Sequence, residues 1–149
     1  MRILVLNGPN LGLLGTREPE IYGRVTLAGI VESVKAHAAE RGVEIVHLQS
    51  DVEGALVAAL GKARSSCDGV IMNPAAFTHC SVALHDAIAA CGLPVVEVHI
   101  SNVYRREGYR HESLTAPCCA GQITGFGPYG YILAFDALME ILSAKTVSK

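Results

Sequence analysis

The sequence predicts an α/β fold in which a parallel β-sheet is covered by helices on both faces. Short apolar runs, bounded by glycine, proline or charged residues, recur along the whole chain. Such runs are typical of strands that are buried on both faces of a sheet. Between them lie longer segments whose apolar residues keep the spacing of one face of a helix. Strands and helices that alternate in this way form parallel sheets with helical connections.

The first apolar run, residues 2–7, is followed by a long stretch in which no helix is expected before about Thr26. In most parallel sheets a helix begins within a few residues of the strand. Here the stretch is interrupted throughout by glycine and proline, at Gly8, Pro9, Gly12, Gly15, Pro19 and Gly23. Loops at the carboxyl ends of parallel strands commonly carry the active site. We therefore predict that residues 14–24 form a lid over a functional site.

The remaining elements continue the alternation. Thr26 is placed to cap a helix that ends at Gly42. Ser50 and Glu53 have the spacing of a capping box at the start of the next helix. Later strands are expected at residues 43–48, 68–73, 93–100 and 121–126, and later helices around residues 56–60, around residues 82–88 and at residues 129–143. Five strands in this order favour a flavodoxin-like, doubly wound sheet in a single domain spanning residues 1–149, with a polar tail at about residues 144–149.

The composition argues against several classes of protein. A net charge of −2 provides no basic surface for nucleic acid or for an anionic membrane. Although 50% of the residues are hydrophobic, no run approaches the roughly 18 apolar residues of a membrane span, and no signal-peptide pattern opens the chain. The five cysteines include no Cys-x-x-Cys pair, which favours reduced thiols and a cytoplasmic location. We expect the apolar surplus in the core and on a buried subunit surface.

Polar residues gather at one edge of the predicted sheet. The carboxyl ends of parallel strands all meet at that edge, whereas the turns at the opposite edge carry nothing comparable. The residues concerned are Asn7, Asn10, Arg17 and Tyr22 after the first strand, Asn73 and His79 after the third, and His99, Ser101, Arg106 and Arg110 after the fourth. This asymmetry predicts a catalytic crevice.

Two pairs of residues suggest proton transfer. An arginine close to a phenol favours the phenolate, so Arg17 would lower the pKa of Tyr22 from its usual value of about 10. A phenolate is basic enough to take a proton from a carbon beside a ketone. Alternatively, Arg17 pairs with neighbouring glutamates in solvent and Tyr22 is exposed. Glu97 lies two residues before His99 and so shares its face of the strand. A carboxylate there would favour the protonated imidazole that a general acid requires, unless His99 is simply a packed core residue.

The glycine-rich loop does not match a phosphate-binding motif, because Pro9 removes an amide donor and no lysine follows. No metal-ligand cluster is evident, and the lysines lie on predicted helix surfaces or in the tail. We therefore expect no cofactor, no metal and no Schiff base. Two alternatives to an enzyme that transfers protons without a catalytic lysine stay open. One is a non-catalytic flavodoxin-like module that binds a nucleotide or flavin, and the other is a hydrolase that uses Cys80, next to His79, as nucleophile.

Several long segments resemble the type II 3-dehydroquinate dehydratases, the lysine-free dehydroquinases of the shikimate and quinate pathways. They are residues 6–23, residues 73–79 with 81–86, residues 97–103 through Arg106 and Arg110, and residues 121–131. The resemblance implies a lyase that converts 3-dehydroquinate to 3-dehydroshikimate and water by anti elimination through an enolate.

The resemblance also implies residue roles. Tyr22, made basic by Arg17, would remove the proton beside the ketone. Asn10 would hold the water that stabilises the enolate oxygen, and His99, paired with Glu97, would protonate the departing hydroxyl. Substrate contacts are implied for Asn73, His79, Asp86, Ile100, Ser101, Arg106 and Arg110.

In this family the residue that matches Asp86 reaches the site of a neighbouring subunit, and the resemblance implies a dodecamer built of trimers. Two features depart from the family pattern, Cys80 and the adjacent pair Cys118 and Cys119. Neither falls on a matched catalytic position, so they bear on redox sensitivity and packing.

Overall fold

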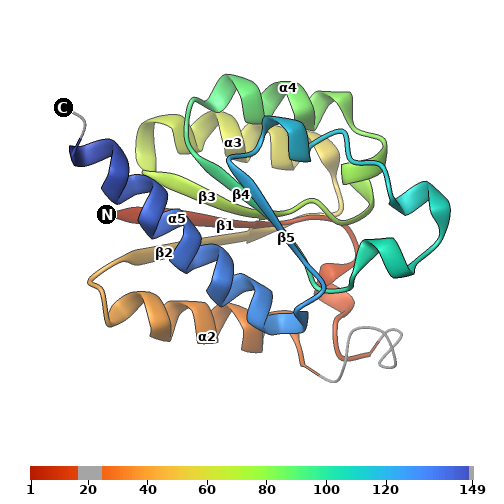
Figure 1. Ribbon diagram of the computed structural model, residues 1–149, viewed down its shortest axis with the longest axis horizontal. Coiled ribbons are helices and arrows are strands. Elements are labelled where there is room, and N and C mark those ends of the chain that lie inside the picture. The colour runs from red at the N-terminus through yellow and green to blue at the C-terminus, as the bar shows by residue number, and fades with distance from the viewer. Residues whose placement is uncertain (17–24, 148–149) are drawn as a thin grey trace.

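The sheet is parallel and five-stranded, as expected. The computed structural model describes residues 1–16 and 25–147. Within this part of the chain the strands run in the order β2-β1-β3-β4-β5, which is the flavodoxin-like order. Their bounds are β1 (Arg2–Asn7), β2 (Glu44–Gln49), β3 (Gly69–Asn73), β4 (Val95–His99) and β5 (Gly121–Thr124). All of them end at the same edge of the molecule (Figure 1).

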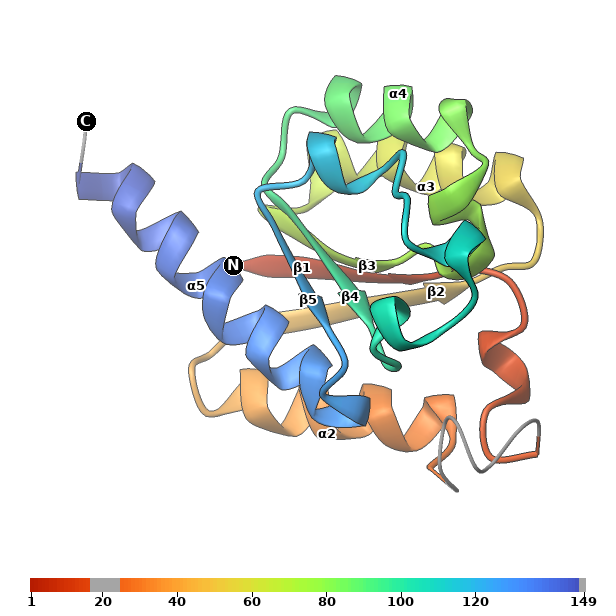
Figure 2. The ribbon, with the colours of Figure 1, turned by 45° about the vertical axis from the view of Figure 1, so that its right-hand side comes forward.

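Helices form a layer on each face of this sheet (Figures 1 and 2). On one face lie α2 (Leu27–Ala39) and α5 (Gly130–Val147), and on the other α3 (Glu53–Ser66) and α4 (Val82–Cys91). Short 3-10 turns follow the strands, namely η1 (Leu11–Leu13), η2 (Ala75–His79), η3 (Val103–Arg105), η4 (Gly108–Arg110), η5 (Ala116–Cys118) and η6 (Gly127–Tyr129). Among the described residues, no helix is long and apolar enough to cross a membrane.

The core is divided by the sheet into two apolar clusters. Alternate side chains of β1 enter opposite clusters, because successive side chains of a strand point to opposite faces. Ile3 and Val5 pack with α2 and α5, whereas Leu4 and Leu6 pack with α3 and α4. This double burial explains why the strands are continuous apolar runs rather than alternating ones.

The expected cap of α2 is confirmed, and that of α3 is wrong. The Thr26 side chain accepts a hydrogen bond from the Gly29 amide, at 3.1 Å, as a helix-capping threonine does. In contrast, Ser50 accepts from the Val52 amide, at 3.0 Å, in a turn that precedes α3. The helix begins at Glu53, so this glutamate occupies the first helical position instead of the third, and no capping box forms.

Gly8 permits the close approach of two loops that follow neighbouring strands. Its amide donates to the Asn73 carbonyl, at 2.8 Å. A Cβ at this position would lie 2.7 Å from the carbonyl carbon of Pro74 and closer still to its oxygen. Both partners are backbone atoms, so a larger residue here would have to push the two loops apart.

The Gly8→Ala variant therefore tests how tightly the two loops are packed. We expect the free energy of unfolding, measured by urea denaturation, to fall by at least about 2 kcal/mol, because the clash involves backbone and cannot relax by a rotamer change. Gly61→Ala is the matched control. Gly61 lies in the middle of α3, and a methyl group added there would have no atom within 4 Å, so this variant is expected to gain about 0.5–1 kcal/mol. Equal stability of the two variants would contradict the account of Gly8.

Candidate active site

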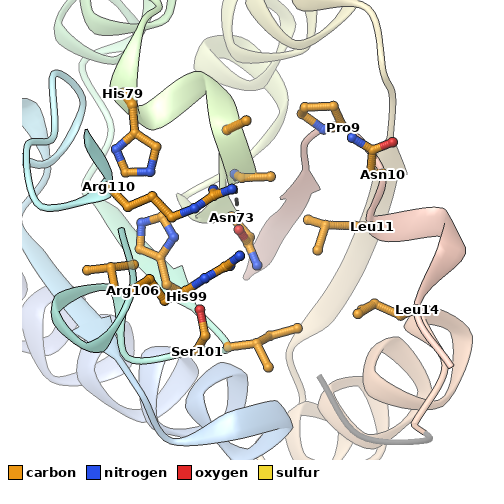
Figure 3. Close-up of a pocket in the computed structure, with 14 residues that line it drawn as sticks. Pro9, Asn10, Leu11, Leu14, Asn73, His79, His99, Ser101, Arg106 and Arg110 are labelled. Carbon is orange, nitrogen blue, oxygen red and sulfur yellow. Dashed lines mark hydrogen bonds between the residues drawn. The ribbon is translucent and has the colours of Figure 1, made fainter. Parts of the chain in front are cut away.

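A cavity lies at the carboxyl edge of the sheet, between the segment after β1 and the segments after β3 and β4 (Figure 3). One wall carries Pro9, Asn10, Leu11 and Leu14, and the arginine and histidine side chains approach from the other (Figure 3). The full lining is Pro9, Asn10, Leu11, Leu14, Asn73, Ala75, Ala76, His79, His99, Ile100, Ser101, Val103, Arg106 and Arg110.

Most of the residues that the sequence singled out meet in this cavity. Those that line it are Asn10, Asn73, His79, His99, Ile100, Ser101, Arg106 and Arg110. Glu97 lies directly behind His99. Asp86 is exposed on α4 and does not line the cavity. Arg17 and Tyr22 fall outside the described residues, as does most of the predicted lid.

Glu97 and His99 form a buried ion-pairing unit on β4. The Nε2 atom of His99 lies 2.7 Å from Oε1 of Glu97, and the Glu97 side chain has no exposed surface. A carboxylate can only accept, so Nε2 carries a proton, and Nδ1 is the ring nitrogen left for a molecule in the cavity. Burial by itself would raise the pKa of Glu97, but the hydrogen bond and the charge of His99, with hydrogen bonds from Thr115 and Gln122, hold it below its ordinary value.

The additional donor groups around Glu97 were not found by sequence reasoning. Thr78, Thr115 and Gln122 place their hydroxyl or amide groups 3.0, 2.6 and 2.8 Å from its two carboxylate oxygens. Gln122 stands opposite Glu97 in the register of β4 and β5, so a glutamine on the strand next to a buried glutamate was a usable signal. The threonines come from η2 and from the loop before η5, where no periodic pattern marks a buried hydroxyl.

His79 is one of the two histidines that line the cavity. Its Nδ1 atom lies 2.6 Å from the carbonyl oxygen of Glu112. The carbonyl can only accept, so Nδ1 carries the proton, and Nε2 is left as the second ring nitrogen. The tautomer is thereby fixed by a backbone group.

Two guanidinium groups give the cavity a positive wall. Nε of Arg110 lies 2.9 Å from the Glu107 carboxylate, and Nε of Arg106 lies 3.6 Å from it. A backbone hydrogen bond and Arg110 lower the pKa of Glu107, so its negative charge persists. Two guanidinium groups in the cavity wall favour an anionic ligand.

Asn73 is held from below by a fully buried tyrosine that sequence reasoning did not connect with the site. Nδ2 of Asn73 donates to the Tyr131 hydroxyl at 2.9 Å, and that hydroxyl donates to Oδ1 of Asn7 at 2.6 Å. The Ala75 amide donates to Oδ1 of Asn73 at 3.1 Å. These bonds orient the amide so that its second Nδ2 hydrogen is the one available to a ligand. Burial raises the pKa of Tyr131, so its hydroxyl remains a neutral link.

Asn10 lies opposite these groups and adopts a left-handed backbone conformation, with φ of 65°. The backbone amide of Asn10 donates to Oδ1 of Asp51 at 2.7 Å. Asparagine tolerates this conformation better than most residues, and the turn brings its side chain to the cavity wall (Figure 3).

The thiol alternative finds little support in the geometry. Cys80 precedes the Ser81 cap of α4, so it does not lie in the first turn of that helix. Its sulfur donates to the Ala76 carbonyl, at 3.6 Å, and Cys80 is not among the cavity-lining residues. Within residues 1–16 and 25–147, no group of His, Cys, Asp and Glu side chains is arranged to hold a metal ion.

The fold and the cavity define an α/β protein with a buried carboxylate–histidine pair and two arginines at the carboxyl edge of its sheet. Residues 1–139 match the family model described as dehydroquinase class II, and the chain belongs to this family.

Individual relatives agree with this assignment. A 3-dehydroquinate dehydratase of Bacillus mycoides is 53% identical over 141 residues, which cover 95% of this chain and 97% of the relative. The crystal structure of a type II dehydroquinase from Butyrivibrio crossotus superposes with a TM-score of 0.91 at 44% identity, covering 93% of this chain and 97% of that one. The type II dehydroquinase from Propionibacterium acnes gives a TM-score of 0.88 at 39% identity, with coverage of 95% and 96%.

The lowered pKa of Glu97 predicts how stability depends on pH. A carboxylate whose pKa falls on folding from 4.5 stabilises the folded state above that pH, and this contribution is lost as the pH falls. At pH 7 we expect Glu97→Gln to lower the free energy of unfolding by about 2–4 kcal/mol. The difference from the unmodified protein should shrink as the pH falls from 7 to below 4.5. Urea denaturation across this range measures it, with Glu140→Gln, on an exposed helix position, as control. A difference that does not change with pH would contradict the ionised state of Glu97.

Proposed function

We propose that this chain converts 3-dehydroquinate to 3-dehydroshikimate and water, without a metal, a cofactor or a Schiff base. The observation that carries the proposal is the buried Glu97–His99 pair, at 2.7 Å, behind a cavity with two arginines in its wall. It supplies an acid for a departing hydroxyl next to charges that suit a carboxylate substrate. Membership of the dehydroquinase class II family supports the same reaction.

Substrate binding follows from the polarity of the cavity. Arg106 and Arg110 attract the substrate carboxylate, and the backbone amides of Ile100 and Ser101 bind it. Asn73 donates its second Nδ2 hydrogen to a substrate hydroxyl, since its other groups are already engaged by Tyr131 and Ala75. His79, which lies beside Arg110 (Figure 3), contributes its Nε2 atom.

The elimination then proceeds through an enolate. Tyr22, as a phenolate favoured by Arg17, removes the proton from the carbon beside the ketone. Negative charge develops on the ketone oxygen, where a water held by Asn10 stabilises it. His99 donates a proton to the tertiary hydroxyl as its bond to carbon breaks, and water leaves from the face opposite to the removed proton. Glu97 stabilises the imidazolium before the transfer.

A direct test is to add 3-dehydroquinate and to follow the absorbance of the conjugated enone product. We expect turnover by the unmodified protein and a loss of at least about 100-fold in kcat for Tyr22→Phe, because a phenyl ring cannot accept the proton. Substrate affinity should be largely unchanged, since the ring remains. Cys80→Ser is the matched control and should stay active. No turnover by folded protein would overturn the proposal, and loss of activity in Cys80→Ser would favour the thiol alternative instead.

The assembly is part of the proposal. Asp86 is exposed on α4 and away from the cavity of its own chain, which supports a role in the site of a neighbouring subunit. We infer a cytoplasmic dodecamer built of trimers, in which each site is completed by Asp86 of an adjacent copy. Exposed apolar side chains such as Val82, also on α4, supply surface that such contacts would bury.

Subunit mixing tests the role of Asp86. Asp86→Ala and His99→Ala should each be nearly inactive alone, whereas co-expression of the two variants should restore activity to roughly a quarter of the sites, because these combine an intact His99 with an intact Asp86 from the neighbour. Light scattering on the same sample should give a mass near twelve times 15.7 kDa. Absence of any restored activity in mixed oligomers would show that Asp86 does not act across subunits.

A further inference from the structure

The two carboxylate oxygens of Glu97 have different numbers of hydrogen-bond donors. Oε1 is approached by several donor groups, of which His99 Nε2 and Gln122 Nε2 are nearest, at 2.7 and 2.8 Å. Oε2 is approached by the Thr115 hydroxyl at 2.6 Å and otherwise only by the weakly donating thiol of Cys119, at 3.8 Å. Among the described residues, Thr115 is therefore the one oxygen or nitrogen donor to Oε2.

Thr115 belongs to a cluster of three hydroxyls whose protons can be assigned by counting. The Thr78 and Thr115 oxygens are 2.6 Å apart, and the Ser113 and Thr78 oxygens are 2.9 Å apart. A contact of 2.6 Å between two oxygens requires a proton between them. The contact from Thr115 to Oε2 of an ionised Glu97 can be filled only by the Thr115 proton. The Thr78 proton must then fill the contact to Thr115, even though Oε1 of Glu97 is also within reach at 3.0 Å.

The far end of the cluster is fixed by the backbone. The Ala116 amide donates to the Ser113 oxygen at 2.8 Å, and an amide can only donate. Ser113 is left to pass its own proton towards Thr78. The reverse orientation is excluded because the Thr78 proton is already used, and it would leave the Ser113 proton only the longer contacts to Thr115, at 3.4 Å, and to Oε1 of Glu97, at 3.5 Å. The hydroxyls therefore align in one direction, towards the carboxylate.

We propose that Ser113, Thr78 and Thr115 form a directed hydrogen-bond relay from the Ala116 amide to Oε2 of Glu97, and that Thr115 is a positioning residue that keeps Glu97 ionised behind His99. Each bond in such a chain polarises the next, so the last donor is stronger than an isolated hydroxyl. None of the three hydroxyl residues lines the cavity. The relay acts through Glu97 on the proton that His99 donates, and in this respect it rests on the proposed function.

The surroundings of Glu97 support this role. The titratable groups that face it are His99 on its own strand and Cys119 from the segment before β5. Burial and the nearby Glu97 raise the pKa of Cys119, so this thiol stays neutral and adds no competing charge. The remaining neighbours, Thr78, Thr115 and Gln122, do not titrate. The ionisation of Glu97 therefore depends on its donors and on His99.

The test compares Thr115→Val with Thr115→Ser. Valine keeps the shape of threonine and removes the donor, whereas serine keeps the donor. For Thr115→Val we expect kcat for 3-dehydroquinate to fall about tenfold with little change in KM, because the substrate contacts are intact. The acidic limb of the pH profile of kcat should move up by about one pH unit, because Glu97 takes a proton more readily without its Oε2 donor. Thr115→Ser should restore both values.

A second readout does not require turnover. The carboxyl carbon of Glu97 can be titrated by NMR in free protein labelled with carbon-13, and Thr115→Val should raise its pKa by about one unit. An inactive unmodified protein would refute the proposed reaction and leave this measurement interpretable. An unchanged Glu97 titration in a folded Thr115→Val variant would overturn the relay even if the reaction is confirmed.

Ser113→Ala separates a relay from a single hydrogen bond. It leaves Thr115 beside Oε2 but removes the polarising donor at the other end of the chain. We expect the Glu97 pKa to rise in the same direction as for Thr115→Val and by a smaller amount. A Glu97 titration identical to that of the unmodified protein would overturn the directed relay. Ser33→Ala, which removes an exposed hydroxyl bonded within α2, should leave the titration unchanged and serves as the control.

Discussion

A buried negative charge behind the cavity-lining His99 constrains this structure more than any other interaction. Glu97 has no exposed surface, and an isolated carboxylate in that position would give up its charge. It keeps the charge because β4, β5 and the loop before η5 direct donor groups at it, and Thr78 of η2 supports the last of these donors, Thr115. Segments that are far apart in the sequence are thereby joined through their hydrogen bonds at Glu97, behind the cavity. The irregular segment between β4 and β5 places the Thr115 hydroxyl beside Glu97.

The parallel sheet positions the remaining residues around the cavity. A parallel sheet brings the ends of β1, β3 and β4 to one edge, where their loops can surround a ligand (Figures 1 and 3). A hydrogen bond to the hydroxyl of Tyr131, which is fully buried in the core, orients Asn73. Arg106 and Arg110 approach from the loop after β4 and share the Glu107 carboxylate. These hydrogen bonds therefore fix the orientation of polar groups in the cavity, which is the preorganisation that electrostatic stabilisation of a ligand requires.

Much of this was predictable from the sequence, and the exceptions have physical reasons. The strand order, the Thr26 cap and the pairing of Glu97 with His99 follow from periodicity and spacing, which are local properties. The capping box at Ser50 was wrong because the serine caps a turn that precedes the helix. The hydroxyls around Glu97 and the link from Tyr131 to Asn73 join residues far apart in the chain, so no local pattern marks them. The catalytic and binding roles of the site residues, Arg17 and Tyr22 included, stay predictions.

The central claim is that Glu97 fixes the His99 ring, with a protonated Nε2 towards the carboxylate and Nδ1 towards the cavity. Nitrogen-15 NMR of histidine-labelled protein measures this directly, because protonated and unprotonated ring nitrogens differ widely in chemical shift. The account predicts a proton on Nε2 of His99 at every pH at which the protein is folded and Glu97 is ionised, and the loss of this fixed tautomer in Glu97→Gln. A ring that carries its single proton on Nδ1 in the unmodified protein, with Nε2 bare against Glu97, would contradict it.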